Sequence, residues 1–300
     1  MGPHLEMRRI ASLCFGAAVA TVATIAAKAR ATELVLETGD SDEGPRSPRT
    51  GNATPSYWAD GAPRLFVSSR IDAGFGYGKA QLAAGYGKPY WMWIGVEAFP
   101  ITTYEFAAFY AGLRAYLPFA DLALGVRDNY SYKFGWLDPK EHHDGPEVRD
   151  RHGDRARYLA WEAVLSGGAP VPLGYALWEA TVDVVTDAPP NVHLYEESIR
   201  AVMKPPKIVM TRLGYLLAFG RNDFIKVGVL GEAIFLPGRA SNVLRIGPVG
   251  SINLTDHLEA LGVVTFAVKS PDTLDTVLGG WAILGLRYKW ATGDKLPRFP

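Results

Sequence analysis

The sequence predicts an all-β fold, a transmembrane antiparallel up-and-down β-barrel of about 12 strands. From about Phe66 to Trp290, apolar and polar residues alternate in segments of roughly ten residues, as in strands with two different faces. Turn-forming residues separate these segments, and aromatic residues recur near their ends, as in a membrane-interface girdle. A sheet exposed to lipid must close on itself to pair its backbone polar groups, so we expect the segments to form a barrel.

An export signal is expected before the barrel. Residues 1–31 contain a basic Arg8-Arg9 pair, an apolar run over 10–27 and small residues at the end of that run, which are the three parts of a signal peptide. The run is mostly Ala, Val and Thr, so we expect cleavage after Ala31 rather than a permanent transmembrane anchor.

Removal of the signal peptide changes what chemistry the chain can carry. It takes away Cys14, the only cysteine, so the mature protein can form no disulfide and has no thiol nucleophile. It leaves 27 basic and 30 acidic side chains, a net charge near −3. This balance excludes a strongly basic nucleic-acid-binding surface, so no nucleic-acid partner is expected.

The mature chain divides into three parts. Residues 32–63 lack periodicity and are rich in Asp, Glu, Pro and Gly, so they are expected to be a flexible linker. The barrel is expected over 64–290. Residues 291–300 then form a short C-terminal tail.

The strand count contains one inconsistency. Residues 64–77 are interpreted as a single strand, with Leu65 and Ile71 on one face and Arg70 on the other. If both ends of the barrel lie on one side of the membrane, the polar loop of residues 135–155 falls on that same side, where such barrels keep their turns short. One hairpin is therefore missing, and we expect it in the Gly-rich stretch 74–87, because Gly weakens the strand pattern.

A soluble β-sandwich is the main alternative, since alternating strands also build sandwiches. Three features favour the barrel: the aromatic residues near strand ends, a strand region of more than two hundred residues, and charges of both signs on the face opposite the apolar one. A sandwich would turn its charged face to solvent, whereas a barrel can enclose it.

The combination of features resembles bacterial outer-membrane β-barrel proteins over most of the mature chain. The resemblance rests on the signal peptide, the strand alternation, the Gly-Tyr-Gly-rich first hairpins and the closing strand Ile283–Trp290. It implies an outer-membrane location and contact with outer-membrane lipid. The chain departs from the pattern in one respect: such barrels usually end at the aromatic residue of the last strand, but residues 291–300 follow Trp290 here.

The polar face predicts a channel lumen. Charged residues of both signs alternate with the apolar positions, and in a barrel they point inward, where they either pair with each other or line a passage for small hydrophilic solutes. The residues expected to line the lumen are Arg70, Asp72, Glu97, Arg114, Asp121, Arg127, Glu179, Asp183, Arg212, Lys226, Glu232, Arg245 and Arg287. Because the signs are balanced, strong selectivity for anions or for cations is not expected.

Two clusters could carry other chemistry. Residues 138–155 hold three of the six histidines among several carboxylates, but basic residues interrupt them without metal-ligand spacing, so we expect a solvated loop and no metal or cofactor. Ser251, Asn253, His257 and Glu259 share a parity across a turn and are weak candidates for an activated hydroxyl. Two alternatives to the channel therefore remain: a barrel hydrolase acting on envelope lipid, and a non-enzymatic structural or interaction barrel.

Overall fold

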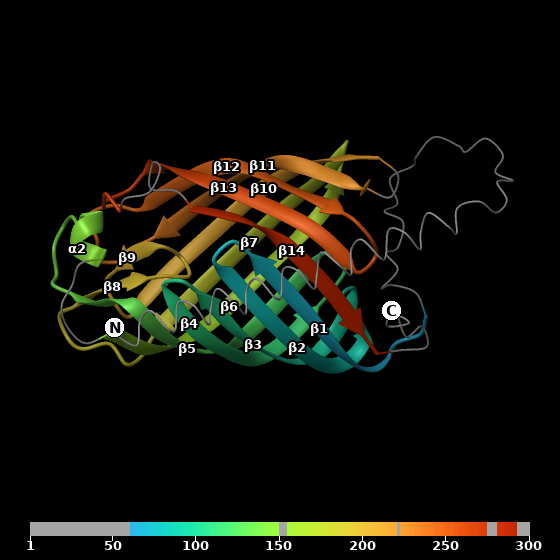
Figure 1. Ribbon diagram of the computed structural model, residues 1–300, viewed down its shortest axis with the longest axis horizontal. Helices are drawn as coiled ribbons and strands as arrows, with labels where there is room; N and C mark the ends of the chain where they lie inside the picture. The colour runs from blue at the N-terminus through green and yellow to red at the C-terminus, as the bar shows by residue number, and fades with distance from the viewer. Residues whose placement is uncertain (1–60, 150–154, 221–222, 275–280, 293–300) are drawn as a thin grey trace, which may run out of the picture. The chain divides into compact units, whose positions relative to one another are not determined.

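The computed structural model describes residues 61–149, 155–220, 223–274 and 281–292. Within these residues, twelve antiparallel strands form a closed barrel, because β1 pairs with both β2 and β14 and every other neighbour along the wall is also hydrogen-bonded (Figure 1). The wall strands are β1 Arg64–Gly74, β2 Tyr77–Lys88, β3 Met92–Thr103, β4 Phe106–Tyr116, β5 Ala120–Leu137, β6 Arg155–Val171, β7 Gly174–Val185, β10 Lys207–Phe219, β11 Ile225–Phe235, β12 Val243–Asn253, β13 Leu258–Lys269 and β14 Trp281–Ala291. The predicted fold class is confirmed.

The two faces of the wall have opposite chemistry. Along β3, Ile94 is 65% exposed, whereas Glu97 on the other face is only 4% exposed. This arrangement inverts the usual rule that apolar side chains are buried and charged ones exposed. The outward apolar band is what a lipid-facing barrel requires, and the charged residues are enclosed.

Small residues let the inner face pack closely. Tyr110 on β4 lies flat over two inward-facing glycines, and a Cβ placed on Gly125 would come within 2.5 Å of the Tyr110 ring. Tyr110 also stacks on Phe99, with ring centroids 4.5 Å apart. Glycine at these positions therefore makes room for large inward side chains in a curved sheet.

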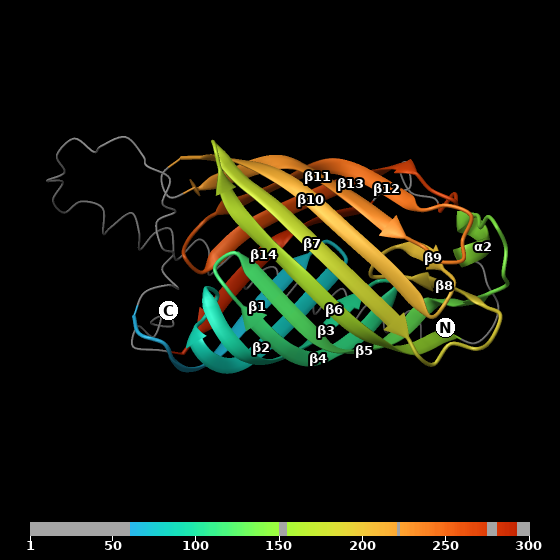
Figure 2. The same cartoon turned by 180° about the vertical axis from the view of Figure 1, so that it is seen from behind.

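The two ends of the barrel differ in their connections. At the end where β1 begins and β14 ends, the strands are joined by short turns such as Pro172–Leu173. The longest connections, residues 138–154 and 186–206, lie at the opposite end, together with the short helix α2 Gly145–Arg149 (Figures 1 and 2). We call these the short-turn end and the long-loop end.

The interpretation of residues 64–77 as one strand was wrong. The chain turns at Phe75–Gly76, where Gly76 adopts a φ of 69°, and returns as β2. This is the hairpin expected within residues 74–87, and its effect is to move the loop of residues 138–154 to the end opposite the chain termini of the barrel. The conflict over loop length is thereby removed.

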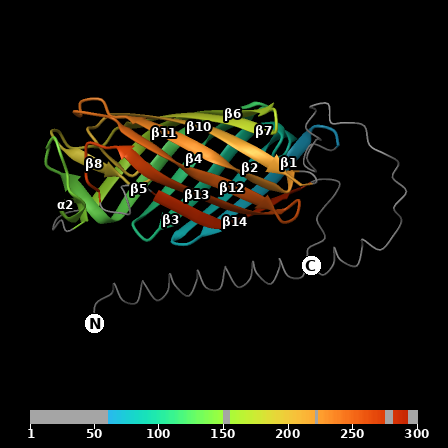
Figure 3. The ribbon, with the colours of Figure 1, turned by 90° about the horizontal axis from the view of Figure 1, so that it is seen from above.

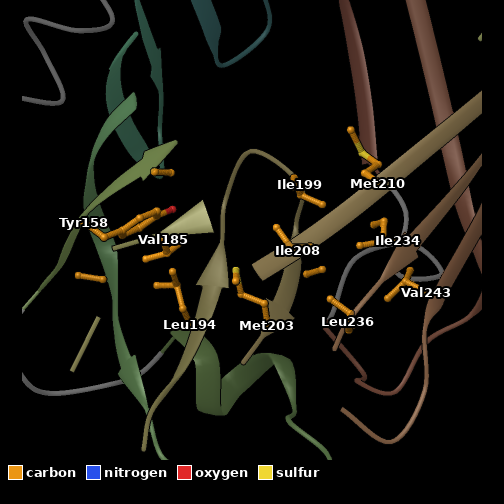
Figure 4. Packing of buried hydrophobic residues seen from close by; sticks show 13 residues of the cluster. Tyr158, Val185, Leu194, Ile199, Met203, Ile208, Met210, Ile234, Leu236 and Val243 are labelled. Atoms are coloured by element: carbon orange, nitrogen blue, oxygen red, sulfur yellow. The ribbon is translucent and has the colours of Figure 1, made fainter. Parts of the chain in front are cut away.

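A small hairpin lies inside the long-loop end. It consists of β8 His193–Glu196 and β9 Ala201–Met203, whose residues are all buried, and β8 pairs with the end of β5 (Figure 3). One face packs against the wall: Leu194 and Met203 lie between Val185 on one side and Ile208 on the other (Figure 4). The other face places Tyr195 and Val202 in a second apolar cluster that includes residues of β5 and α2.

Several predictions fall on residues that the structure does not describe. The signal peptide, the linker through residue 60 and the tail from residue 293 lie outside the described ranges. Among the residues that are described, no helix is long and apolar enough to cross a membrane.

Candidate functional site

The candidate site is the charged inner face of the barrel together with hairpin β8–β9. The residues predicted to line the lumen all occupy enclosed positions on the strands, opposite the apolar outer face. They interact with one another or with nearby inner residues in ion pairs, and the Nζ of Lys226 lies 5.8 Å from the centre of the Tyr175 ring. Whether they line a water-filled passage stays a prediction.

Arg127 joins the hairpin to the wall. Its guanidinium is buried and contacts Glu162 of the neighbouring strand β6 at 2.9 Å and Asp183 of β7, the next strand along the wall, at 2.7 Å. It also contacts Glu196 of the hairpin at 2.9 Å. A buried charge is tolerated only when it is paired, and here one cation serves three carboxylates.

Arg245 provides a second attachment. Its guanidinium donates to the backbone carbonyls of Ile199 at 2.9 Å and Arg200 at 2.6 Å, in the turn of the hairpin. The same side chain binds Glu232 at 2.6 Å. Glu232 in turn binds Arg212, which also reaches Glu179, so this attachment continues into the ion pairs of the wall.

The tip of the hairpin carries a second buried acid. Tyr158 of β6 donates its hydroxyl to Glu196 and lies 3.3 Å from Glu197. Burial and the neighbouring Glu196 carboxylate raise the pKa of Glu197 to about 8. Glu197 is therefore held protonated at neutral pH, which spares the hairpin a second buried negative charge.

Several ion pairs in the other half of the lumen are longer. Asp72 lies 2.7 Å from Arg287 but 3.6 Å from Arg70. Glu259 lies 3.7 Å from Arg287 and 3.5 Å from Lys289. The tightly held cations of this half are Arg287, bound to Asp72, and Arg114, bound to Glu97 at 2.7 Å and to Asp121.

Four connections meet in a polar network at the long-loop end. His143 lies with Nε2 3.0 Å from Nδ1 of His193, and the Arg239 guanidinium is 3.0 Å from the same Nδ1. Arg239 also binds Asp272, whose carboxylate accepts the backbone N–H of His143 at 2.9 Å. Since Arg239 can only donate, Nδ1 of His193 must be unprotonated.

This network holds its histidines neutral. Burial, followed by the nearby Arg239 charge, lowers the pKa of His143 to about 4 and lowers that of His193 as well. The prediction that residues 138–155 form a solvated loop was wrong for His143, which is 0% exposed. No group of three or more His, Cys, Asp or Glu in the described part of the chain is placed to hold a metal ion.

The weak catalytic candidates lie near one another but do not form a triad. Nδ1 of His257 lies 2.9 Å from the carbonyl of Lys289, and Glu259 faces Arg287 and Lys289. Asn253 donates to the carbonyl of Asp223 at 3.3 Å and stands opposite Glu259 in the pairing of β12 with β13, while Ser251 hydrogen-bonds Glu259. A triad needs its carboxylate on Nδ1 of the histidine, and here a backbone carbonyl occupies that position.

Several residues of the site were not predicted. Glu196, His143, His193 and Arg239 belong to connections, so the alternation that identifies wall strands cannot identify them. Lys79 and Lys289 follow the inward parity of β2 and β14, and that parity was the signal that could have found them.

Comparison with known proteins gives only distant similarities. No protein-family model matches the chain, and no curated protein matches its sequence. Solved structures with a similar arrangement include a chain from a study of the in-meso crystallization of membrane proteins, with 8% identity and a TM-score of 0.40 over 77% of this chain and 83% of that one. Another is OmpT of Vibrio cholerae with loop L8 deleted, an outer membrane protein, with 8% identity and a TM-score of 0.34 over 76% of this chain and 99% of that one.

Proposed function

We propose that this outer-membrane β-barrel is a channel for small hydrophilic solutes and that hairpin β8–β9 is its gate. The observation that carries the proposal is the way in which the hairpin is held inside the long-loop end. Two arginines of the wall, Arg127 and Arg245, bind its carboxylate and its turn carbonyls. The hairpin is a single insertion between β7 and β10, so it can leave the lumen without breaking the closed wall.

The remaining lumen supports a passage. On the inner face away from the hairpin, side chains keep partial exposure, for example 22% for Arg212 and 28% for Arg287. Charged, partly exposed walls are typical of aqueous pores, and a barrel of this size lies between small filled barrels and large porins. By the usual orientation of bacterial barrels, the short-turn end faces the periplasm and the gate faces outward.

Single-channel conductance tests the gate. The full mature chain, residues 32–300, is compared in planar lipid bilayers with a variant in which residues 193–203 are replaced by a short Gly-Ser linker. We expect rare or small steps from the wild type and stable, larger ohmic steps from the variant. The E196Q variant, which removes the charge that Arg127, Tyr158 and Ser198 bind, should open more often than wild type, while E141Q in the exposed loop serves as its control.

The contrary result supports a different function. If the linker variant is inserted and folded yet remains silent, the lumen is closed by its wall side chains and the gate proposal fails. The apolar clusters on both faces of the hairpin would then favour the non-enzymatic structural barrel, with the hairpin as a permanent part of the core. The hydrolase alternative has less support, because a backbone carbonyl rather than the Glu259 carboxylate lies at Nδ1 of His257.

A further inference from the structure

The charges of the lumen are balanced in number but segregated around the barrel. Over six consecutive wall strands, from β13 through β14 and β1 to β4, five cations and three carboxylates share the inner face. These cations are Arg70, Lys79, Arg114, Arg287 and Lys289, and the carboxylates are Asp72, Glu97 and Glu259. Over the remaining wall and the hairpin the carboxylates are in excess. One side of the lumen is therefore locally basic.

Three of these cations are neighbours around Arg70, and we call Arg70, Lys79 and Lys289 the cationic triad. Arg70 stands directly opposite Lys289 in the pairing of β1 with β14. On its other side, Lys79 is opposite Asp72 in the pairing of β1 with β2, which makes Lys79 the diagonal neighbour of Arg70. Like charges directly opposite one another on a sheet destabilise it unless an anion lies between them.

The carboxylates around the triad do not neutralise it. Arg70 approaches Asp72 only to 3.6 Å, and Arg287 holds that carboxylate at 2.7 Å. Lys289 approaches Glu259 to 3.5 Å. In the described part of the chain no carboxylate is within ion-pair distance of Lys79, whose ammonium lies 3.5 Å from the centre of the Phe99 ring. On the acidic side of the lumen, by contrast, each of Arg127, Arg212 and Arg245 has carboxylates at 2.6 to 2.9 Å.

The triad also has one hydrogen-bond donor without a partner, and two of its side chains are partly exposed. Arg70 Nε is buried without a hydrogen-bond partner. The side chains of Arg70 and Lys289 are nevertheless 21% and 28% exposed. A planar guanidinium between two ammonium groups matches an anion with several oxygens, since such charge-assisted bonds are the strongest that side chains make.

We infer that the cationic triad is a binding site for a small phosphate-type oxyanion in the lumen. An oxyanion there would accept from Arg70 and Lys289 across the β1–β14 pair and from Lys79 on the next strand. Such an oxyanion would be the solute of the proposed channel, so this inference rests on the proposed function. Its binding can nevertheless be measured without any ionic current.

Isothermal titration calorimetry of the mature protein in detergent micelles, with inorganic phosphate at pH 7 and low salt, tests the site. We expect saturable binding to the wild type that weakens as sodium chloride is added. The R70Q and K79Q variants should each bind about tenfold or more weakly, the effect of removing one charge-assisted bond. K79Q breaks no ion pair in the described structure, so it serves even if R70Q folds poorly. K226Q removes an inner cation outside the triad and should bind within about twofold of wild type.

Each outcome decides between the two proposals. No binding to the wild type, or equal weakening by K79Q and K226Q, overturns the site. Binding that depends on the triad in a protein whose linker variant conducts nothing leaves the site standing and removes the channel. If the linker variant conducts but the wild type binds no phosphate, the channel stands and the anion site is overturned.

Discussion

At the scale of single residues, the lumen depends on the pairing of a few buried charges. Arg127 makes three ion pairs in an environment from which water is excluded, and one of its partners, Glu196, belongs to the hairpin. The stability that such a cluster adds over an apolar core is small, but removing one member leaves the others unpaired. Arg127 is therefore expected to be among the residues most sensitive to substitution.

Replacing Arg127 with Met tests this sensitivity. R127M keeps an unbranched, flexible side chain but removes the guanidinium that faces Glu162, Asp183 and Glu196. We expect a loss of about 3 to 5 kcal/mol in the free energy of unfolding, the usual cost of breaking a buried pair. Denaturant unfolding of the protein in lipid vesicles measures it.

A matched control for R127M is R157M. Arg157 pairs with Asp128 on the exposed surface at 2.9 Å, so its loss should lower the free energy of unfolding far less than the loss of Arg127. Equal losses from the two variants would show that the buried cluster is not a special contributor to stability.

At the scale of elements, the wall and the loops differ in how far the sequence predicts them. A wall strand has one face in lipid and one in the lumen, so its alternation is visible in the sequence, as in β3 and β5. The turn at Phe75–Gly76 was hidden because the glycines around it stand at the polar positions of the pattern, so the alternation continues through the turn. Hairpin β8–β9 is buried on both faces, so it carries no alternation at all.

The candidate site was predictable to the same extent. Inward charges such as Asp72 and Glu232 follow from strand parity, whereas their partners across the barrel depend on register, which one sequence does not specify. Glu196 and His143 lie in connections, and only the folding of those connections over the barrel brings them to Arg127 and His193. The three-dimensional arrangement was therefore needed to find the residues that hold hairpin β8–β9.

The network of the long-loop end should weaken in acid. The pKa of His143 is about 4 in the folded protein, below its ordinary value of 6.5. The unfolded chain therefore binds more protons between these values, so the stability that neutral His143 contributes is complete above pH 6.5 and is lost as the pH falls toward 4. The lowered pKa of His193 acts in the same direction.

Hydrogen exchange of residues 138–149 measures this effect. We expect backbone protection in this connection to fall severalfold between pH 7 and pH 5, after correction for the intrinsic exchange rate. The H143Q variant should lose most of this pH dependence. His142 is exposed, and its pKa is raised by the Pro271 carbonyl and by Asp144, so it should stabilise slightly as the pH falls. Protection that increases on acidification would contradict the role given to His143.

At the scale of the whole molecule, the apolar outer face of the closed barrel is expected to be covered by lipid instead of being exposed to water. Leu65 of β1 and Val96 of β3 are both apolar, exposed and on the outer face of the wall. Leu65 is at the beginning of β1, near the short-turn end, whereas Val96 is in the middle of β3. If the outer face is in a bilayer, a charge at these two positions meets different surroundings.

The V96R and L65R variants therefore measure how the barrel is placed in the membrane. Arginine near the midplane of a bilayer costs about 2 to 4 kcal/mol, and near the interface about 0 to 1 kcal/mol. We expect V96R to lower the free energy of unfolding in lipid vesicles by the larger amount and L65R by the smaller. In a soluble protein both positions would already face water, and both substitutions would be nearly neutral. Unfolding that is unaffected by V96R would thus contradict the lipid-facing wall on which the channel, the gate and the anion site all depend.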